Sequence, residues 1–187
     1  MPHYVFPKKY ADFVQRLRVP CGFLLLITFA LFSQPSPTSL FMGLPVSACG
    51  LLLRAWAAGH LAKNRDLAVS GPYAYMRNPL YAGTLITALG IVIAARSWTL
   101  VPIFAIVFLL VYLPAIELEE QHLRVIFPTY AAYADRVNRF LPFRKWPTPG
   151  APFSSALYLK NEEYKAALGF LIAVAWLVIK LFRPALL

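Results

Sequence analysis

The sequence predicts an all-α, polytopic membrane protein with about five transmembrane helices. Hydrophobic residues make up 59% of the 187 residues, charged residues only 14%, and the mean hydropathy is +0.60. Five apolar segments, several close to the ~20 residues that a bilayer-spanning helix needs, alternate with short polar or proline-containing stretches. We therefore interpret residues 1–187 as a single membrane domain. It divides into an N-terminal two-helix hairpin (1–62), a central core (63–145), and a linker with an extra C-terminal helix (146–187).

The first two apolar segments predict a helical hairpin. Residues 19–32 are apolar but number only 14, so the first helix is expected to extend back through residues 13–17. No small-residue cleavage site follows, which favours an uncleaved start over a signal peptide. Prolines in 33–39 predict a tight turn, and a second helix follows over about 40–61. Arg54 interrupts that helix, and for this charge we favour a snorkelling or ion-paired structural role over a functional one.

The stretch from Ser70 to Gly83 lies between two long apolar segments. Gly71-Pro72 predicts a turn. Asn78-Pro79 predicts a helix start, because Asn is a good N-cap and Pro at the first helical position needs no amide partner. The free N–H groups at that helix start would suit a carboxylate or phosphate beside Tyr73 and Arg77. The alternative is a plain loop, with its arginine in the lipid headgroups and its tyrosines in the interfacial belt.

The third and fourth spans are predicted over residues 80–95 and 98 to about 118, joined by Arg96-Ser97. Such a short link forces an antiparallel hairpin, so the start of one span and the end of the other meet at one membrane face. Glu117, Glu119 and Glu120, three of the eight acidic residues, lie at the end of the fourth span. We expect them near Tyr73, Arg77, Asn78 and Tyr81. This second polar cluster favours a functional site.

The fourth helix is expected to continue beyond the membrane until Pro128. Glu120 and Arg124 have the i,i+4 spacing and order of a favourable ion pair, and Glu119 shares a face with Leu123. A short helix then places Tyr130, Tyr133 and Val137 at helical spacing, which we interpret as a packing stripe. Residues 143–153 predict an extended linker. Asn161-Glu162-Glu163 predicts the cap and acidic first turn of a last helix, whose apolar part is 166–182.

The basic residues predict the orientation of the chain. Fourteen of the 18 lysine and arginine residues fall in the N-terminal segment and the loops on its side of the membrane, three fall on the other side, and Arg54 lies within a span. The positive-inside rule therefore predicts a cytoplasmic N-terminus and a candidate site that faces the cytoplasm. We expect a multi-pass integral membrane protein, and the short loops favour a prokaryotic inner membrane.

Composition argues against several other classes of function. The net charge of +10 is spread over loops that flank apolar helices, which is typical of anchoring to an anionic leaflet rather than of nucleic-acid binding. Cys21 and Cys49 match no metal or redox spacing, so we interpret them as small buried residues. We expect no nucleic-acid partner, no metal and no thiol chemistry.

The motifs of the central core resemble a known family. Gly-Pro-Tyr is followed by Arg-Asn-Pro-x-Tyr-x-Gly, a hairpin, Glu-Glu-x-x-Leu, Phe127, and the tyrosine stripe before a proline. This order resembles the isoprenylcysteine carboxyl methyltransferase and phospholipid methyltransferase superfamily over about residues 60–145. Members are integral membrane enzymes that use S-adenosylmethionine, although membrane sterol reductases share a similar C-terminal core. The last span is extra to the usual pattern.

The resemblance implies roles for particular residues. Those expected to line the cofactor pocket are Arg65, Leu67, Ala68, Tyr73, Asn78, Pro79, Leu80 and Tyr81. Glu119 would hold the cofactor's ammonium group, Glu120 would be its partner at the pocket rim, and Arg77 with the helix N-terminus would suit the cofactor's carboxylate. We name Glu120 and Arg77 as the candidate catalytic residues.

Two positions depart from the family pattern. Many members have Arg-His-Pro where this chain has Asn78, and Asn cannot titrate, so no proton transfer is expected of it. The carboxyl methyltransferases tend to carry an arginine where this chain has Ala115. This difference argues against an isoprenylcysteine substrate and leaves the cofactor prediction intact.

We therefore predict an S-adenosylmethionine-dependent methyltransferase that acts on a lipophilic or amphiphilic acceptor at the membrane. Such a reaction needs mainly the acceptor held in line at ~3 Å with water excluded. An amine or hydroxyl acceptor would also need a base, for which Glu117 or Glu120 is the nearest candidate. The alternatives are a nicotinamide-dependent membrane reductase on the same core, and a non-catalytic membrane scaffold or transporter. The almost wholly apolar mid-span positions disfavour a transporter.

Overall fold

The structure is a computed structural model that describes residues 6–147 and 150–182. Those residues form an all-α fold, as predicted, in which the only β-type pairing is an isolated bridge between Met76 and Asn138. The helical elements are α1 (Lys8–Phe32), α2 (Pro37–Ala58), η1 (Gly71–Ala74), α3 (Pro79–Ala95), α4 (Leu100–Val107), η2 (Phe108–Tyr112), α5 (Leu113–Ile126), α6 (Tyr130–Arg136), α7 (Ser155–Lys160) and α8 (Tyr164–Phe182).

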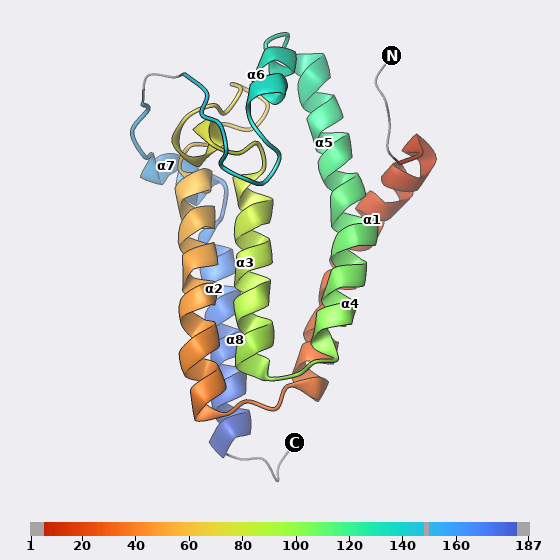
Figure 1. The fold of residues 1–187 in the computed structure, drawn as a ribbon, viewed down its shortest axis with the longest axis vertical. Coiled ribbons are helices and arrows are strands. Elements are labelled where there is room, and N and C mark those ends of the chain that lie inside the picture. The colour runs from red at the N-terminus through yellow and green to blue at the C-terminus, as the bar shows by residue number, and fades with distance from the viewer. Residues whose placement is uncertain (1–5, 148–149, 183–187) are drawn as a thin grey trace.

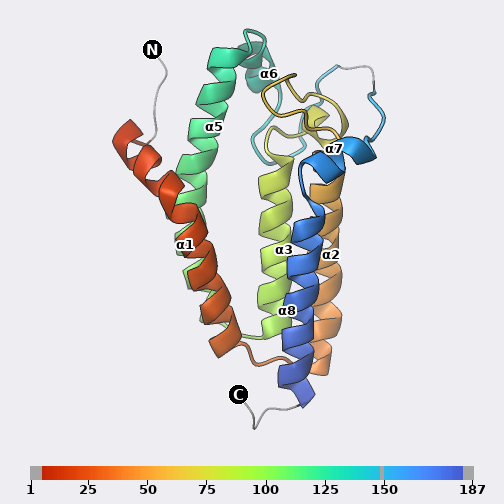
Figure 2. The same ribbon diagram turned by 180° about the vertical axis from the view of Figure 1, so that it is seen from behind.

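The long helices form two groups that are joined at one end of the molecule. Helices α2, α3 and α8 lie side by side, while α1 lies along the continuous rod of α4, η2 and α5 (Figures 1 and 2). Short links after α1 and α3 join the groups at the end opposite η1 and α6 (Figure 1). The start of α1 lies at the same end as η1 and α6. The loops that carry the candidate site are therefore gathered at one end of the helices.

In the part of the chain that the structure describes, three helices are long and apolar enough to cross a membrane. They are Pro37–Ala58, the 27-residue rod Leu100–Ile126 and Tyr164–Phe182, and two shorter apolar helices cover Pro20–Phe32 and Pro79–Ala95. The apolar surface is largely unburied, since only 6% of the apolar window of α8 is covered by the rest of the described chain. These features fit a polytopic membrane protein. The count of five spans and the cytoplasmic N-terminus stay predictions.

The first helical hairpin forms largely as predicted. Helix α1 extends back to Lys8, further than residues 13–17, and so gains the length that its apolar part lacks. Helix α2 begins at Pro37, where Ser36 and Ser39 form a reciprocal capping box with bonds of 3.1 and 2.9 Å. This cap satisfies two backbone amides that a helix start leaves without partners.

Helices α2 and α3 are in close backbone contact because glycines face each other along their interface. A Cβ atom on Gly43 would meet the backbone of Ala94 and Gly90, and one on Gly83 would meet the carbonyl oxygen of Gly50 at 2.7 Å. Two hydrogen bonds from serine side chains of α2 also cross this interface. Small residues of this kind let helices approach closely within a membrane, where hydrophobicity gives little drive for association.

Those two bonds are donated by serines of α2. Ser39 Oγ donates to the carbonyl of Ala94 at 2.9 Å, and Ser47 Oγ donates to the carbonyl of Thr87 at 3.0 Å. Both acceptors are backbone oxygens of α3. The serines can reach them only because the glycine contacts bring the helices so close.

Proline chemistry explains one contact between α1 and the α4–α5 rod. Pro114 has no N–H and cannot donate to the carbonyl of Leu110 four residues earlier. The Tyr10 hydroxyl on α1 donates to that carbonyl at 2.7 Å. In addition, Val14 is buried against Val107 and Val111. The Leu110 carbonyl is thus a hydrogen-bond acceptor on the rod, and Tyr10 of α1 donates to it.

Three predictions about packing need correction. Helices α3 and α4 run antiparallel from a short link, as predicted, but they do not pack along each other. Helix α3 packs along α2 through the glycine interface, and the rod packs along α1. Cys49 is exposed on α2, whereas Cys21 is partly buried. Residues 161–163 form a turn after α7, and α8 begins at Tyr164 without the predicted acidic residues in its first turn.

We predict that Gly90→Ala destabilises the protein. The new Cβ would meet Ser47 and, at 2.5 Å, the carbonyl oxygen of Gly43, so the helices would have to separate. Overpacking of this kind costs about 1–3 kcal/mol, which should lower the midpoint of thermal unfolding in detergent by about 3–10 °C. The control is Gly169→Ala, whose Cβ meets nothing within 4 Å. Equal midpoints for the two variants would contradict the close α2–α3 contact.

We also predict the sidedness of two loops. In a background without Cys21 and Cys49, Gln34→Cys should react with a membrane-impermeant maleimide from outside intact cells. Asp66→Cys should react only after permeabilisation, because the two exposed positions lie at opposite ends of α2. The reverse pattern would show that the N-terminus lies outside.

Candidate functional site

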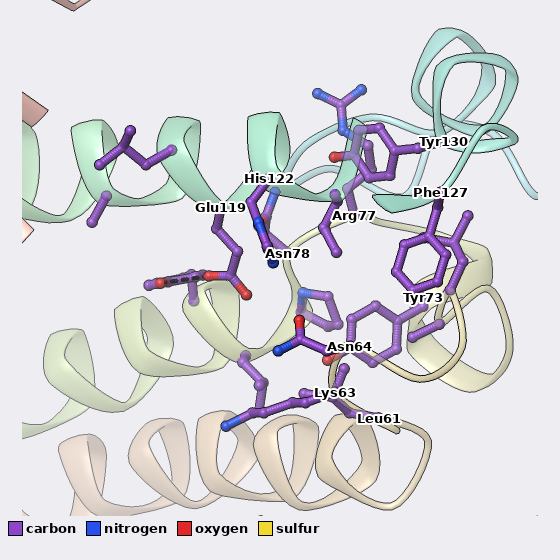
Figure 3. A pocket seen from close by; sticks show the side chains of 18 of the residues that line it. Leu61, Lys63, Asn64, Tyr73, Arg77, Asn78, Glu119, His122, Phe127 and Tyr130 are labelled. Carbon is purple, nitrogen blue, oxygen red and sulfur yellow. Dashed lines mark hydrogen bonds between the residues drawn. The ribbon is translucent and has the colours of Figure 1, made fainter. Parts of the chain in front are cut away.

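A cavity of about 830 Å³ lies where the start of α3, the end of α5 and the loop after α2 come together (Figure 3). Its walls come from segments far apart in sequence, including α1, α2 and α6 as well. Nine of the predicted site residues line it: Leu67, Ala68, Tyr73, Arg77, Asn78, Pro79, Leu80, Tyr81 and Glu119. The predicted meeting of the Ser70–Gly83 stretch with the end of the fourth span is therefore confirmed.

Two of the predicted residues do not line the cavity. The Arg65 side chain is 85% exposed and lies 3.7 Å from Asp66, so the surrounding loop faces the cavity without it. Glu120 is buried beside the cavity, where its carboxylate is bound by other side chains. Glu117 is also buried and outside the lining, with its Oε1 3.5 Å from the amide nitrogen of Gln121.

A tight turn brings the chain into the site. Gly71 has φ of +58°, a conformation that glycine adopts without strain, and a Cβ there would meet the His60 ring at 2.5 Å. Burial lowers the pKa of His60, whose Nδ1 lies 3.2 Å from Ser70 Oγ. His60 therefore packs as a neutral ring behind the turn. It is not among the residues that line the cavity.

Helix α3 begins at Pro79, as predicted, but Asn78 does not cap it. The Asn78 amide donates to Glu120 Oε1 at 2.8 Å, and no side-chain cap bond is present at this helix start. The backbone amides of Arg77 and Asn78 donate to the carbonyls of Asn138 and Arg139. The residue before α3 is therefore used to join α3 to α5 and to the segment after α6.

The Glu120 carboxylate is the centre of a buried ion cluster. Arg77 donates to its two oxygens at 3.0 and 3.2 Å, and Arg139 donates to Oε2 at 2.9 Å. The Glu120 side chain is only 6% exposed. A carboxylate buried to this degree needs charged partners and several hydrogen bonds to offset its desolvation, and the cluster supplies both.

The predicted Glu120–Arg124 pair is wrong. Glu120 faces Arg77 and Arg139 instead, and the Arg124 guanidinium lies 5.4 Å from the centre of the Tyr130 ring. Sequence reasoning missed Arg139, because its position depends on how the chain returns after α6. The isolated bridge between Met76 and Asn138 fixes that return.

The remaining hydrogen bonds of Arg77 are also made within the protein. Its Nη1 donates to the carbonyls of Ala134 and Val137 at 2.6 and 3.1 Å. All three guanidinium nitrogens therefore have partners, although the side chain lines the cavity. This geometry suits a positioning role for Arg77 better than direct contact with a carboxylate ligand.

Buried tyrosines close one side of the cavity. Tyr130 and Tyr133 form the predicted packing stripe with Val137, and they also line the cavity together with Tyr73. The Tyr133 hydroxyl donates to the Tyr73 carbonyl at 2.7 Å. Burial raises the pKa of all three phenols, and the charge of Glu119 adds to the effect at Tyr73. These hydroxyls therefore stay protonated at neutral pH.

Glu119 is the carboxylate that α5 presents to the cavity. The Tyr81 hydroxyl donates to its Oε2 at 3.0 Å (Figure 3). One turn away on either side of Glu119, Ala115 and His122 also line the cavity. Sequence reasoning did not select His122, although its i+3 spacing from Glu119 puts both on one helix face. Among the described residues, no group of three or more His, Cys, Asp or Glu side chains is arranged to hold a metal ion.

The segment that builds most of this site matches a family model. Residues 38–130, about half of the chain, match the family described as phospholipid methyltransferase. This segment is therefore similar in sequence to that family. It runs from α2 to the start of α6 and contains every cavity-lining residue except Asp12 and Tyr133. The resemblance stated from the sequence motifs is thus confirmed.

Three curated relatives extend this comparison. The chain is 34% identical over 109 residues to the cobalt-zinc-cadmium resistance protein CzcN of Cupriavidus metallidurans, covering 57% of this chain and 50% of that protein. It is 34% identical over 91 residues to the nickel-cobalt-cadmium resistance protein NccN of Alcaligenes xylosoxydans xylosoxydans, covering 48% and 43%. It is 26% identical over 141 residues to the protein-S-isoprenylcysteine O-methyltransferase of Schizosaccharomyces pombe, covering 72% and 59%.

The chain thus spans about half the length of the curated relatives it matches. No solved structure shows a significant match to it.

We predict that Glu120→Gln lowers the stability of the fold. The substitution leaves Arg77 and Arg139 close together without the carboxylate that neutralises them, and breaking a buried ion pair in this way costs about 3 kcal/mol. The matched control is Glu162→Gln, where a solvent-exposed pair with Lys165 is lost at little cost in stability. Thermal unfolding in detergent measures both. If the two variants unfold at the same temperature, the cluster does not hold the site together.

Proposed function

We propose that the chain is an integral membrane methyltransferase that binds S-adenosylmethionine in the 830 Å³ cavity and methylates a lipophilic or amphiphilic acceptor. The observation that carries this proposal is the Glu119 carboxylate, which the family-matched segment presents to a cavity that the predicted cofactor residues line. The volume lies within the range of about 300–1,000 Å³ that is usual for small-molecule sites.

The donors and acceptors around the cavity fit the chemistry of this cofactor. Its amino-acid end carries an ammonium group, which suits the Glu119 carboxylate, and a carboxylate, which suits the positive end of the α3 helix dipole. The aromatic rings of Phe127 and Tyr130 line the same cavity and suit a planar purine. Arg77 is not needed for the carboxylate, since its own bonds are already made.

The cofactor would supply an electrophilic methyl group on a sulfonium centre. For the protein, the remaining task is to hold an acceptor in line with that group and to exclude water. Tyr73, Tyr130 and Tyr133 are buried and protonated, and they support this role by forming a rigid, largely dry wall. Glu120 supports it by fixing Arg77 and Asn78 at the start of α3.

This arrangement changes the candidate roles of the acidic residues. Glu117 and Glu120 do not line the cavity, and the Glu120 carboxylate already accepts bonds from three side chains. We therefore assign Glu120 a positioning role and propose neither residue as a base. The carboxylates that do line the cavity are those of Asp12, Asp66 and Glu119.

We also propose that the site faces the cytoplasm of a prokaryotic cell, with the acceptor arriving from the bilayer. The start of α1 and the cavity lie at the same end of the molecule (Figure 1), so a cytoplasmic N-terminus would put the cofactor site on the side where the cofactor is made. The apolar helices below the cavity provide the lipid-facing route for the acceptor.

We predict that S-adenosylmethionine binds to the purified protein and that Glu119→Gln weakens the binding about ten- to a hundredfold. The substitution removes a charge-assisted hydrogen bond worth roughly 1.5–3 kcal/mol. Isothermal titration calorimetry in detergent measures both proteins, and Glu162→Gln, which alters an exposed carboxylate away from the cavity, is the control.

A parallel titration with NADPH separates the methyltransferase from the reductase alternative. Unchanged affinity in Glu119→Gln would remove Glu119 from the site. Binding of NADPH without binding of S-adenosylmethionine would overturn the proposed function.

A further inference from the structure

Arg54 is a charged residue within α2, and its side chain lines the cavity. Its Nε donates to Glu163 Oε1 at 2.5 Å, and its Nη2 donates to Glu163 Oε2 at 3.0 Å. The remaining nitrogen, Nη1, donates to the Leu80 carbonyl at 3.3 Å and to the Thr84 hydroxyl. The side chain is 23% exposed, whereas that of Glu163 is only 8% exposed. The guanidinium is therefore fully engaged by protein groups.

The partner carboxylate comes from outside the family-matched segment. Glu163 lies in the turn between α7 and α8, beyond residue 130 (Figure 2). The side-chain amide of Asn161 fixes that turn by donating to the carbonyls of Ala58 and Leu61 at 2.9 and 2.8 Å. The backbone N–H of Ser154 also donates to the carbonyl of Gly59. The C-terminal part of the chain thus brings one carboxylate to Arg54, which lines the cavity.

The second arginine of the cavity is occupied in the same way. Arg77 is bound by both oxygens of Glu120 and by two backbone carbonyls. Arg54 and Arg77 are the arginines that line the cavity within the described residues, and each is neutralised by a buried carboxylate. A carboxylate ligand binds best to a free guanidinium that can donate two parallel hydrogen bonds. Neither guanidinium of the cavity is in that state, and Ala115 on α5 adds no charge. The lining also includes Lys63, a solvent-exposed ammonium that lacks the planar two-point geometry of a guanidinium.

We propose that Glu163 is a specificity-determining residue, which occupies the Arg54 guanidinium and so restricts the cavity to acceptors whose headgroup is neutral or cationic. The other carboxylates that line the cavity, those of Asp12, Asp66 and Glu119, favour the same headgroups. Removing the Glu163 charge would release Arg54 toward the cavity and open it to carboxylate acceptors. This inference rests on the proposed function, because it takes the ligand of this cavity to be a methyl acceptor.

The test compares the binding of two matched amphiphiles, N-acetyl-S-farnesylcysteine and its carboxamide, in the absence of S-adenosylmethionine. The unmodified protein should bind the neutral carboxamide more tightly. Glu163→Gln should improve binding of the carboxylate about tenfold or more, as expected for a gained charge-assisted bond, and should leave the carboxamide unchanged. The double variant Arg54→Gln/Glu163→Gln is the control, and it should lose the gain because the released guanidinium is gone.

A second variant covers the case in which Glu163→Gln does not fold. Glu163→Asp keeps the charge that Arg54 needs but is one methylene shorter, so it should weaken the two-point contact and give a smaller gain for the carboxylate. Circular dichroism and thermal unfolding identify the folded variants.

Equal binding of the two amphiphiles to the unmodified protein, a gain that persists without Arg54, no gain in any folded single variant, or no binding of either amphiphile would overturn the proposal. Because no cofactor is present, failure of S-adenosylmethionine to bind would be seen separately and would count against the proposed function.

Discussion

One buried carboxylate holds together the parts of the chain that make the cavity. Glu120 on α5 accepts bonds from Arg77 and Asn78 before α3 and from Arg139 after α6. Helix α3 otherwise packs on α2, and the α4–α5 rod packs on α1. The two helix groups are therefore linked covalently at one end and by this ion cluster at the other. Because the cluster is buried, it needs each of its partners: removing one would leave a charge that neither water nor lipid can solvate.

The helices and the location of the site were accessible from the sequence because each follows from a local rule. A bilayer-spanning helix needs an apolar run of a certain length, and a short link such as Arg96-Ser97 requires the chain to reverse. Together these rules brought Tyr81 and Asn78 to the end of the fourth span, where they contact Glu119 and Glu120. The glycines at 43 and 50 and at 83 and 90, spaced seven apart, also carried a signal for the α2–α3 contact, although it was not used.

The partners of the charged residues were not accessible in the same way. An i,i+4 pair such as Glu120–Arg124 is worth only about 0.5 kcal/mol on a helix surface. A buried carboxylate is governed instead by the need to satisfy every lone pair, and the tertiary fold decides which groups arrive. Arg139 reaches Glu120 through the return of the chain after α6, and Glu163 reaches Arg54 from the turn before α8. The spacing of these residues in the sequence predicts neither ion pair.

The π-helical turn η2, Phe108–Tyr112, has a consequence for the register of the whole site. A π-helical turn accommodates one extra residue within an α-helix. Each later residue therefore lies on a face shifted by about 100° from the one it would take in an uninterrupted α-helix of the same sequence. The face of the rod that contacts α1 lies before or within this turn, at Val107 and Val111, and the face that presents Glu119 to the cavity lies after it. The angle between the two faces is thus set by a single residue. The same residues in an uninterrupted α-helix would keep the apolar length and the motifs, yet they would turn a neighbouring side chain, and not Glu119, toward the cavity. The π-helical form of this turn is therefore as necessary to the site as the motif residues themselves.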